Sequence, residues 1–223
     1  MTDVVMFDLD GTLVDTPRAI VETFTATLAA LGVQPQGADT IRATIGLPLE
    51  QAFGRLMGVP REDILVAQGV KQYQVLFREI ILPKAAALVF PGVPEGLAAL
   101  RARGSRLAVA TSKFYASADA LLRAAGLRDV FLEVVGADQV SQPKPHPEVG
   151  QLILSRLECP PTRAVMVGDT THDLRMARAA GMRSIAVTYG VHGVAELLTA
   201  EPTWMVGSFD EVVSCITSEP TRT

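Results

Sequence analysis

The stretch that decides the fold lies near the start of the chain and reads Val4-Val5-Met6-Phe7-Asp8-Leu9-Asp10-Gly11-Thr12. Its leading apolar residues predict a short strand. Asp8 and Asp10 come directly after it, and residues two apart at the end of a strand point to the same side. Gly11 permits a tight turn that brings main-chain amides near an anion. We therefore expect oxygen ligands that suit a magnesium ion at the end of this strand.

Short apolar runs alternate with helical patterns over most of the chain, which is typical of βαβ units and a parallel sheet. The predicted strands are Val4 to Phe7, Leu107 to Ala110, Leu132 to Val135, Ala164 to Val167, Ser184 to Val187 and Trp204 to Val206. The predicted helices between them are Val93 to Arg103, Ala116 to Ala125, Pro147 to Leu157 and Leu174 to Ala180. Together they predict an α/β fold with a Rossmann-like parallel sheet at its core.

Residues 16–88 break this alternation, because they show helical patterns without a convincing strand. Thr16 as N-cap and Pro17 at the first helical position open a helix whose apolar residues recur at helical spacing. Further helical patterns cover Leu49 to Met57, Ile64 to Ala67 and Val70 to Ile81. We predict an all-helical domain at 16–88, inserted into a core made of 1–15 and 89–223. The segments 14–16 and 90–94 are the predicted hinge between them.

Composition and charge limit the classes of partner. Hydrophobic residues make up 48% and charged residues 20% of the chain, the mixture of a globular protein. The formal net charge of −4 offers no basic surface for nucleic acid, and no apolar run reaches the roughly 18 residues that cross a bilayer. The start lacks a signal-peptide pattern, and Cys159 and Cys215 lie outside any metal or redox spacing. We expect a cytoplasmic monomer or homodimer with no nucleic-acid or membrane partner.

A second acidic pair, Asp169 and Asp173, follows the predicted strand Ala164 to Val167. The four-residue step places both carboxylates near the start of a helix, where acidic residues also occur as simple caps. In an open α/β sheet, ligands bind beyond the carboxyl ends of the strands, and both acidic pairs lie there. Two such pairs at one edge favour a shared site over two separate turns.

Clustered carboxylates repel one another and any phosphate, so this site needs positive charge from a metal and from a basic side chain. Lys144 is the best candidate, because Pro143 and Pro145 stiffen the backbone around it. Thr111 follows the strand Leu107 to Ala110 and offers a hydroxyl at the same edge. The alternatives, a solvent-exposed lysine and a helix-capping threonine, stay open on the residues alone.

Four motifs therefore occur in order, Asp8-Leu9-Asp10-Gly11-Thr12, Thr111-Ser112, Lys144-Pro145 and Gly168-Asp169-Thr170-Thr171-His172-Asp173. They resemble the motifs of the haloacid dehalogenase superfamily and span nearly the whole core. The helical insert after the first motif resembles the C1 cap of that superfamily. The run Lys144-Pro145-His146-Pro147, with the second acidic motif, is most similar to its phosphoglycolate phosphatase branch.

The resemblance implies a mechanism. Asp8 would be the nucleophile that forms an aspartyl-phosphate, and Asp10 would protonate the leaving group and then deprotonate the attacking water. The implied Mg²⁺ ligands are the Asp8 carboxylate, the Asp10 main-chain carbonyl and Asp169, with Asp173 orienting them. The implied substrate-binding residues are Gly11, Thr12, Thr111, Ser112 and Lys144. Lys144 and Thr111 would hold the equatorial phosphoryl oxygens.

A carboxylate at Asp10 further implies phosphate esters or anhydrides, since the dehalogenase and phosphonatase members lack it. The expected function is hydrolysis of a small phosphorylated metabolite, with 2-phosphoglycolate as the first candidate. The alternatives are an inorganic pyrophosphatase, a phosphosugar mutase similar to β-phosphoglucomutase, and a non-enzymatic binding module. The retained charges of the four motifs argue against the last of these.

Substrate choice is expected to lie in the cap. The loop Ile45-Gly46-Leu47-Pro48 could approach the core on closure. Arg42, Arg55 and Arg78 are candidate partners for a carboxylate of the substrate. A lidded site favours a small substrate over a protein, because closure must exclude water around the phosphoryl group.

Overall fold

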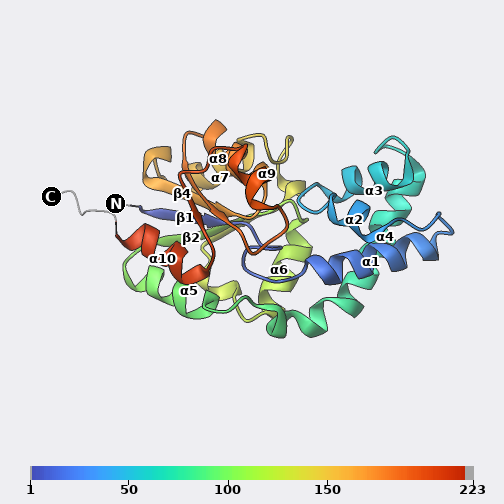
Figure 1. The fold of residues 1–223 in the computed structure, drawn as a ribbon, viewed down its shortest axis with the longest axis horizontal. Helices are drawn as coiled ribbons and strands as arrows, with labels where there is room; N and C mark the ends of the chain where they lie inside the picture. Colours follow the sequence, from blue (N-terminus) through green and yellow to red (C-terminus); the bar gives the residue numbers. More distant parts are fainter. Residues whose placement is uncertain (1, 219–223) are drawn as a thin grey trace.

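A computed structural model describes residues 2–218 and shows a six-stranded parallel sheet flanked by helices (Figure 1). The strands are β1 (Val4–Phe7), β2 (Arg106–Ala110), β3 (Glu133–Val135), β4 (Ala164–Gly168), β5 (Arg183–Val187) and β6 (Trp204–Val206). Their spatial order is β3-β2-β1-β4-β5-β6, so the order reverses between β1 and β4. Open α/β sheets bind ligands at this reversal, beyond the carboxyl ends of the strands. The predicted α/β fold with a Rossmann-like sheet is confirmed.

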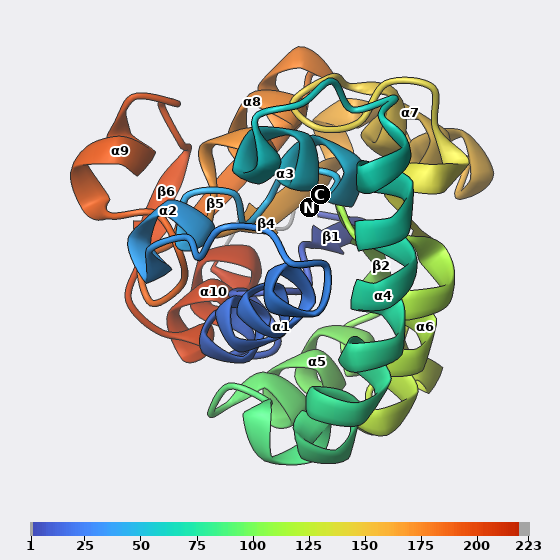
Figure 2. The same ribbon diagram turned by 90° about the vertical axis from the view of Figure 1, so that its right-hand side faces the viewer.

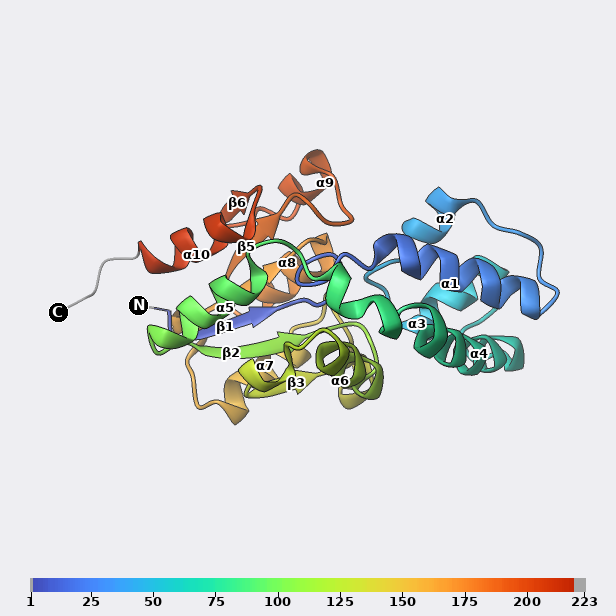
Figure 3. The same ribbon diagram turned by 90° about the horizontal axis from the view of Figure 1, so that it is seen from below.

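Helices cover both faces of the sheet (Figure 3). The helices on the same side of the hinge as the sheet are α5 (Val93–Ala102), α6 (Tyr115–Ala124), α7 (Glu148–Arg156), α8 (Thr171–Ala179), α9 (Val194–Leu198) and α10 (Phe209–Thr217). Three 3-10 turns accompany them, Arg128–Val130, Ala137–Gln139 and Pro161–Arg163. Val5 and Phe7 share one apolar cluster with α5, α6 and α10, while Val4 and Met6 share another with α7 and α8. Because alternate residues of a strand face opposite sides, β1 is buried on both. This burial fixes the position of the carboxylates that follow β1.

The elements between β1 and α5 are helical and lie together beyond the carboxyl ends of the strands (Figures 1 and 3). They are α1 (Pro17–Ala30), α2 (Ala38–Arg42), α3 (Leu49–Met57), α4 (Ile64–Ile80) and the 3-10 helix η1 (Leu82–Leu88). Aromatic rings hold these helices together, with the Phe24 centroid 4.7 Å from that of Tyr73 and 4.9 Å from that of Phe53. The predicted all-helical insert is therefore present as a cap over the sheet edge.

The cap differs from the sequence prediction in α4. Two helices are predicted there, on either side of Gly69, but α4 runs without a break from Ile64 to Ile80. A Cβ on Gly69 would lie 3.1 Å from Cδ1 of Phe53 and 3.1 Å from Cε of Met57. The glycine thus permits close packing of α4 on α3, and this packing outweighs its poor helix propensity.

Two neighbouring chain crossings join the cap to the core. Val14 pairs with Val89 in an antiparallel bridge, and the Asp15 N–H donates to the Leu88 carbonyl oxygen at 2.7 Å. The first crossing lies in the predicted hinge segment 14–16, and the second, at Leu88 and Val89, lies just before the predicted segment 90–94. We propose residues 16–88 as the cap and residues 1–15 with 89–223 as the core.

The predicted strands agree with the observed strands to within one residue at each end. Leu132 lies just outside β3 with 60% of its surface exposed. The short helices α2 and α9, five residues each, are not predicted, because so short a segment shows little periodicity. The nine-residue α10 is not predicted either.

The polar composition of residues 218–223 predicts a frayed end. Apart from Ser218, these residues lie outside the described part of the chain. Within residues 2–218, no helix combines the length and apolar character needed to cross a bilayer.

Gly96→Ala will lower the free energy of unfolding by about 1–3 kcal/mol, because it overpacks the contact between α5 and α10. A Cβ on Gly96 would lie 2.6 Å from Cδ1 of Phe209, which is 2% exposed. Urea unfolding followed by circular dichroism measures the change. The control Ala98→Ser, on the exposed side of α5, should stay within about 0.5 kcal/mol of wild type. Unchanged stability of Gly96→Ala would show that α10 shifts to accept the methyl group.

Candidate active site

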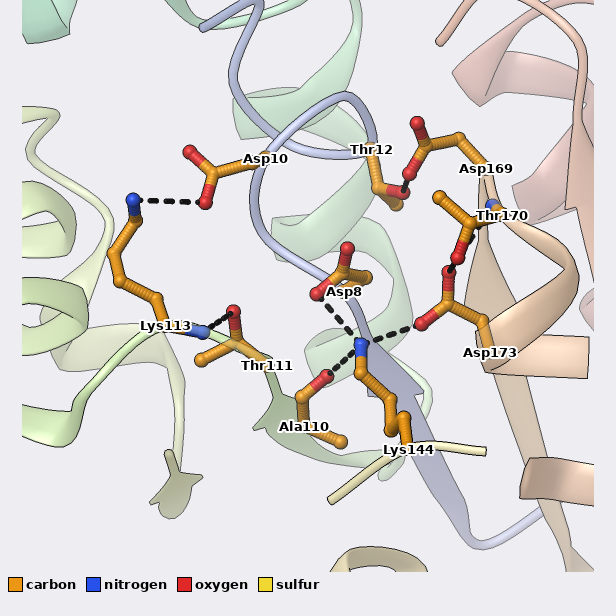
Figure 4. Close-up of polar contacts among 10 residues, drawn as sticks. All are labelled: Asp8, Asp10, Thr12, Ala110, Thr111, Lys113, Lys144, Asp169, Thr170 and Asp173. Atoms are coloured by element: carbon orange, nitrogen blue, oxygen red, sulfur yellow. Dashed lines mark hydrogen bonds and ion pairs between the residues drawn. The ribbon is translucent and has the colours of Figure 1, made fainter. Parts of the chain in front are cut away.

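The motif residues meet at the carboxyl ends of β1, β2 and β4 (Figure 4). Asp8 follows β1, Thr111 follows β2 and Asp169 follows β4. Since β1 is hydrogen-bonded to both β2 and β4, these residues are brought to one edge of the sheet. Asp173 comes from the first turn of α8, and Lys144 comes from the loop between β3 and α7.

The ammonium group of Lys144 is at the centre of the site. Its Nζ donates to Asp8 Oδ1 at 2.9 Å, to the carbonyl oxygen of Ala110 at 3.0 Å and to Asp173 Oδ1 at 2.5 Å. The residue is only 4% exposed. A buried cation must be paired, and here two carboxylates and a carbonyl surround it. The alternative of a solvent-exposed lysine is therefore excluded.

Three buried carboxylates, those of Asp8, Asp169 and Asp173, form a cluster around this cation. Each offers an oxygen, and these oxygens all lie within 4.8 Å of one another. The side chains of Asp8 and Asp10 line a cavity under the cap, whereas Asp169 and Asp173 lie outside its lining. The cluster therefore presents one carboxylate, that of Asp8, to a ligand.

Neighbouring groups orient the other two carboxylates. Asp169 accepts from the Thr12 hydroxyl at 2.9 Å and from the Val191 N–H at 2.8 Å. Asp173 Oδ2 accepts from the Thr170 hydroxyl at 2.6 Å and from the Thr170 N–H at 3.1 Å, and the second bond belongs to a capping box at the start of α8. The sequence prediction missed Thr170 and Val191. Thr170 could have been found from its Thr-x-x-Asp spacing, but Val191 acts through its backbone and leaves no signal in the sequence.

Burial and mutual repulsion shift the protonation of the cluster. Burial raises the pKa of Asp8 to about 7, with Lys144 opposing the rise and the charges of Asp173 and Asp10 adding to it. Burial also raises the pKa of Asp169 well above its usual range, with contributions from Asp8 and Asp173. Burial alone would lower the pKa of Lys144, but Asp173 and Asp8 outweigh it and raise that pKa. One lysine does not balance the charge of three carboxylates, so the charge of the cluster favours binding of a second cation.

The donor set fits a divalent cation of the magnesium type, because all the side-chain donors are hard carboxylate oxygens. Glycines keep space around Asp169. A Cβ on Gly11 would lie 2.2 Å from Asp169 Oδ2, and one on Gly190 would lie 2.3 Å from the same atom. Gly11 also has a φ of +82°, which other residues rarely adopt. Both glycines therefore permit the close approach of backbone to the carboxylate.

The Asp10 carboxylate lies apart from the cluster (Figure 4). Its Oδ1 accepts from the Thr16 hydroxyl at 2.6 Å, and its Oδ2 lies 3.0 Å from Lys113 Nζ. The same Nζ lies 4.7 Å from the ring centroid of Phe77 in α4. Lys113 thus connects the Asp10 carboxylate to the cap.

Two of these contacts correct the sequence analysis. Thr16 stands at the N-cap position of α1 but makes no side-chain cap hydrogen bond; its backbone is helical, with φ −91° and ψ −14°, and its hydroxyl donates to Asp10. Lys113 is missing from the predicted site, although it directly follows Thr111-Ser112. A single lysine at the start of a helix gave no reason to place it there.

The hydroxyls at the end of β2 line the cavity. Thr111 Oγ1 accepts from the Lys113 N–H at 3.2 Å. Ser112 Oγ is buried and has no hydrogen-bond partner within the described residues. A buried hydroxyl without a protein partner is available to a ligand oxygen. The binding role of Ser112 stays a prediction with which this free hydroxyl is compatible, whereas the Thr12 hydroxyl is engaged by Asp169.

The cap lies against the core around this cavity, and Figure 2 shows α1–α4 in front of the sheet edge. Gly46 of the predicted loop is so close to the core that a Cβ there would lie 3.2 Å from Thr170 Cγ2. Arg42 donates to the Gly190 carbonyl oxygen at 3.2 Å. The cavity is partly open, and its volume of about 60 Å³ holds roughly four to six water-sized groups. The cavity therefore suits a small ligand.

The arginines considered for substrate binding lie elsewhere. Arg42, Arg55 and Arg78 are all exposed, and none of them lines the cavity in the described part of the chain. Arg42 contacts the core through Gly190, as described above. Arg55 and Arg78 fall on the solvent sides of α3 and α4.

Comparisons with known proteins agree with this geometry. The family model for Haloacid dehalogenase-like hydrolase matches residues 5–187. Probable phosphatase IndB of Dickeya dadantii is 56% identical over 213 residues, which cover 96% of this chain and 93% of the relative. A Phosphoglycolate phosphatase of Nitrosospira multiformis is 38% identical, with 83% of each chain covered. The crystal structure of a predicted phosphatase from Clostridium acetobutylicum has a TM-score of 0.85 and 27% identity, and the match covers 97% of this chain and 99% of that one.

In EDTA, Asp8→Asn will gain stability relative to wild type as the pH rises from about 4 to 7. The pKa of Asp8 is about 7 in the folded protein against an ordinary value of 3.8. The folded state therefore holds the extra proton, and wild type loses stability as the pH rises from about 4 to 7. Asparagine does not ionise and escapes this loss, which is on the order of a few kcal/mol.

Thermal unfolding of both proteins across this pH range measures the difference. His172 and His192, whose pKa values do not depend on Asp8, contribute equally to the two proteins, and the difference includes the part of the Asp169 shift that Asp8 causes. Mg²⁺ should reduce the difference by stabilising ionised Asp8 in wild type. A difference in Tm that does not change with pH would contradict the raised pKa.

Proposed function

Because this chain belongs to the haloacid dehalogenase-like hydrolase family, we propose that it is a magnesium-dependent phosphatase that hydrolyses a small phosphomonoester through an aspartyl-phosphate on Asp8. One observation carries the proposal. Asp8 lines the cavity with its Oδ1 held by Lys144, and Asp10 lines the same cavity in a separate set of contacts. The site thus offers one carboxylate for attack and another for proton transfer.

Asp8 is the proposed nucleophile. Lys144 holds its Oδ1 at 2.9 Å, and we assign the attack on phosphorus to Oδ2. The new bond between Asp8 and phosphorus forms as the bond between phosphorus and the ester oxygen breaks. Water then attacks the phosphorus of the aspartyl-phosphate, which releases inorganic phosphate and restores the carboxylate.

Asp10 is the proposed acid and base. An alkoxide is a poor leaving group, so Asp10 donates a proton to the departing ester oxygen and later removes one from the attacking water. Thr16 and Lys113 hold its two oxygens and so orient the carboxyl group toward the cavity.

The remaining groups of the proposed site balance the negative charge of the phosphoryl group or position the groups that do so. Bound Mg²⁺ would supply positive charge beside the phosphoryl oxygens, held by the carboxylates of Asp8 and Asp169 and the Asp10 carbonyl. Asp173 fixes Lys144 through their 2.5 Å contact. Lys144 and the Thr111 and Ser112 hydroxyls would stabilise the charge on the transferring phosphoryl group.

The resemblance to the phosphoglycolate phosphatase branch makes 2-phosphoglycolate the first ester to test, and the Phosphoglycolate phosphatase of Nitrosospira multiformis supports this choice. Pyrophosphate and a sugar phosphate test the pyrophosphatase and mutase alternatives in the same assay. Free Cys159 and Cys215 fit the proposed cytoplasmic location, where thiols stay reduced.

With Mg²⁺, wild type will release phosphate from phosphomonoesters, and Asp8→Asn will lower kcat by at least about 10³-fold, because it removes the nucleophile at nearly constant volume. Initial rates with 2-phosphoglycolate, pyrophosphate, a hexose phosphate and p-nitrophenyl phosphate measure this. Acid-quenched protein should carry a phosphoryl group in wild type and none in the variant.

The matched control is Asp15→Asn, which makes the same change at an exposed position close to the hinge and should keep wild-type rates. Near-normal turnover by Asp8→Asn would refute its role as nucleophile. Conversion of the hexose phosphate to an isomer without phosphate release would favour the mutase.

Asp10→Asn will slow esters of alkyl alcohols by about 10²- to 10⁴-fold while slowing p-nitrophenyl phosphate much less in the step that forms the aspartyl-phosphate. The reason is that p-nitrophenolate leaves without a proton. Single-turnover kinetics isolates this step, and Asp15→Asn again serves as the control. Equal slowing of both esters would remove the acid role from Asp10.

A further inference from the structure

The wall of the cavity beyond Asp8 is apolar. Its residues include Ile20, Phe24, Leu47, Leu49, Tyr73 and Phe114. The rings of Phe24 and Tyr73 lie with their centroids 4.7 Å apart and form an aromatic surface on the cap side. A ligand whose phosphoryl group is next to Asp8 would place its other end against this hydrocarbon surface.

The wall has no cation left for a second anion. Lys113 is the only basic residue in the lining among the described residues. Its Nζ is already 3.0 Å from Asp10 Oδ2 and 4.7 Å from the ring centroid of Phe77. Lys144 lies outside the lining and is held by Asp8 and Asp173.

The polar groups of the cap wall are neutral. The Thr44 hydroxyl donates to the Ile41 carbonyl oxygen at 2.7 Å. Burial raises the pKa of Tyr73 above its usual range, and the charge of Asp10 adds to this rise, so the phenol stays protonated. A neutral hydroxyl can contact an uncharged group, but it does not balance a carboxylate enclosed beside Asp10.

From this wall we infer that the substrate is the phosphate ester of an uncharged alcohol with a small apolar carbon portion, and not an ester with a second anion near the phosphate. The inference rests on the proposed phosphatase function and narrows its substrate. Burial of an apolar group against Phe24, Leu47 and Tyr73 is favourable. Burial of a carboxylate there is unfavourable, because it loses water, meets no free cation and lies near Asp10. The same argument disfavours 2-phosphoglycolate and pyrophosphate.

Two esters of similar shape and different charge test the inference. Isobutyl phosphate and 2-phosphoglycolate each carry a branched group on a methylene, with two methyl groups in one and two carboxylate oxygens in the other. With wild type and Mg²⁺, we expect kcat/KM for isobutyl phosphate to exceed that for 2-phosphoglycolate by at least about 10-fold. Carbamoylmethyl phosphate, the neutral amide of 2-phosphoglycolate, should also exceed 2-phosphoglycolate.

Leu47→Lys tests whether the wall causes this preference, because it places a cation in the lining. We expect it to shift the ratio of the two kcat/KM values toward 2-phosphoglycolate by at least about 10-fold. The matched control is Leu65→Lys on α4, where the leucine is 40% exposed and outside the lining. Since both enzymes use the same two esters, differences in intrinsic reactivity cancel. Ser117→Lys, from the core side of the cavity, repeats the test if Leu47→Lys does not fold.

The outcomes distinguish a failure of the substrate inference from a failure of the proposed phosphatase function. A wild-type preference for 2-phosphoglycolate or pyrophosphate, or the same ratio in Leu47→Lys and Leu65→Lys, would overturn the inference. Turnover of p-nitrophenyl phosphate that depends on Asp8, without turnover of either neutral ester, would also overturn it and leave the phosphatase intact. No phosphate release from any ester, p-nitrophenyl phosphate included, would instead overturn the proposed function.

Discussion

The site depends on one buried ammonium group held between carboxylates. Lys144 joins Asp8 after β1, the Ala110 carbonyl at the end of β2 and Asp173 in α8, so a single cation ties together segments from four parts of the sequence. Removing it would leave buried carboxylates facing one another in a region of low polarity, which is strongly unfavourable. The same attraction keeps Oδ1 of Asp8 fixed. Stability of the sheet edge and orientation of the proposed nucleophile therefore come from the same contacts.

The strands and the motif positions could be predicted from the sequence because both depend on local patterns. Four apolar residues before Asp8 mark a strand, and acidic residues after two parallel strands must meet at one edge. The contacts of Lys113 and Thr16 with Asp10 could not be predicted, since they depend on how the cap returns to the core. The continuity of α4 through Gly69 was missed for a related reason. Glycine signals a break locally, but tertiary packing against Phe53 and Met57 decides the outcome.

In the proposed function, the core supplies the groups that bind the phosphoryl group, and the cap supplies most of the apolar surface of the cavity. The core holds carboxylates, a lysine and hydroxyls, which recognise a phosphoryl group whatever is attached to it. The cap provides mostly apolar side chains to the cavity, and the arginines that seemed suited to a substrate carboxylate lie outside its lining. Resemblance of the core motifs to a branch of the family therefore says little about the leaving group. The side chains that would contact that group lie in the cap, between the first two strands.

The pairing of Val14 with Val89 has a consequence for how such proteins diversify. The chain leaves the core and returns to it at adjacent points, so the two ends of the cap lie side by side. Exchanging the cap changes the connection between β1 and β2 but leaves the order of the strands and the carboxylates that follow them in place. New specificities can then arise by changes in the cap, while the carboxylates of the core are kept.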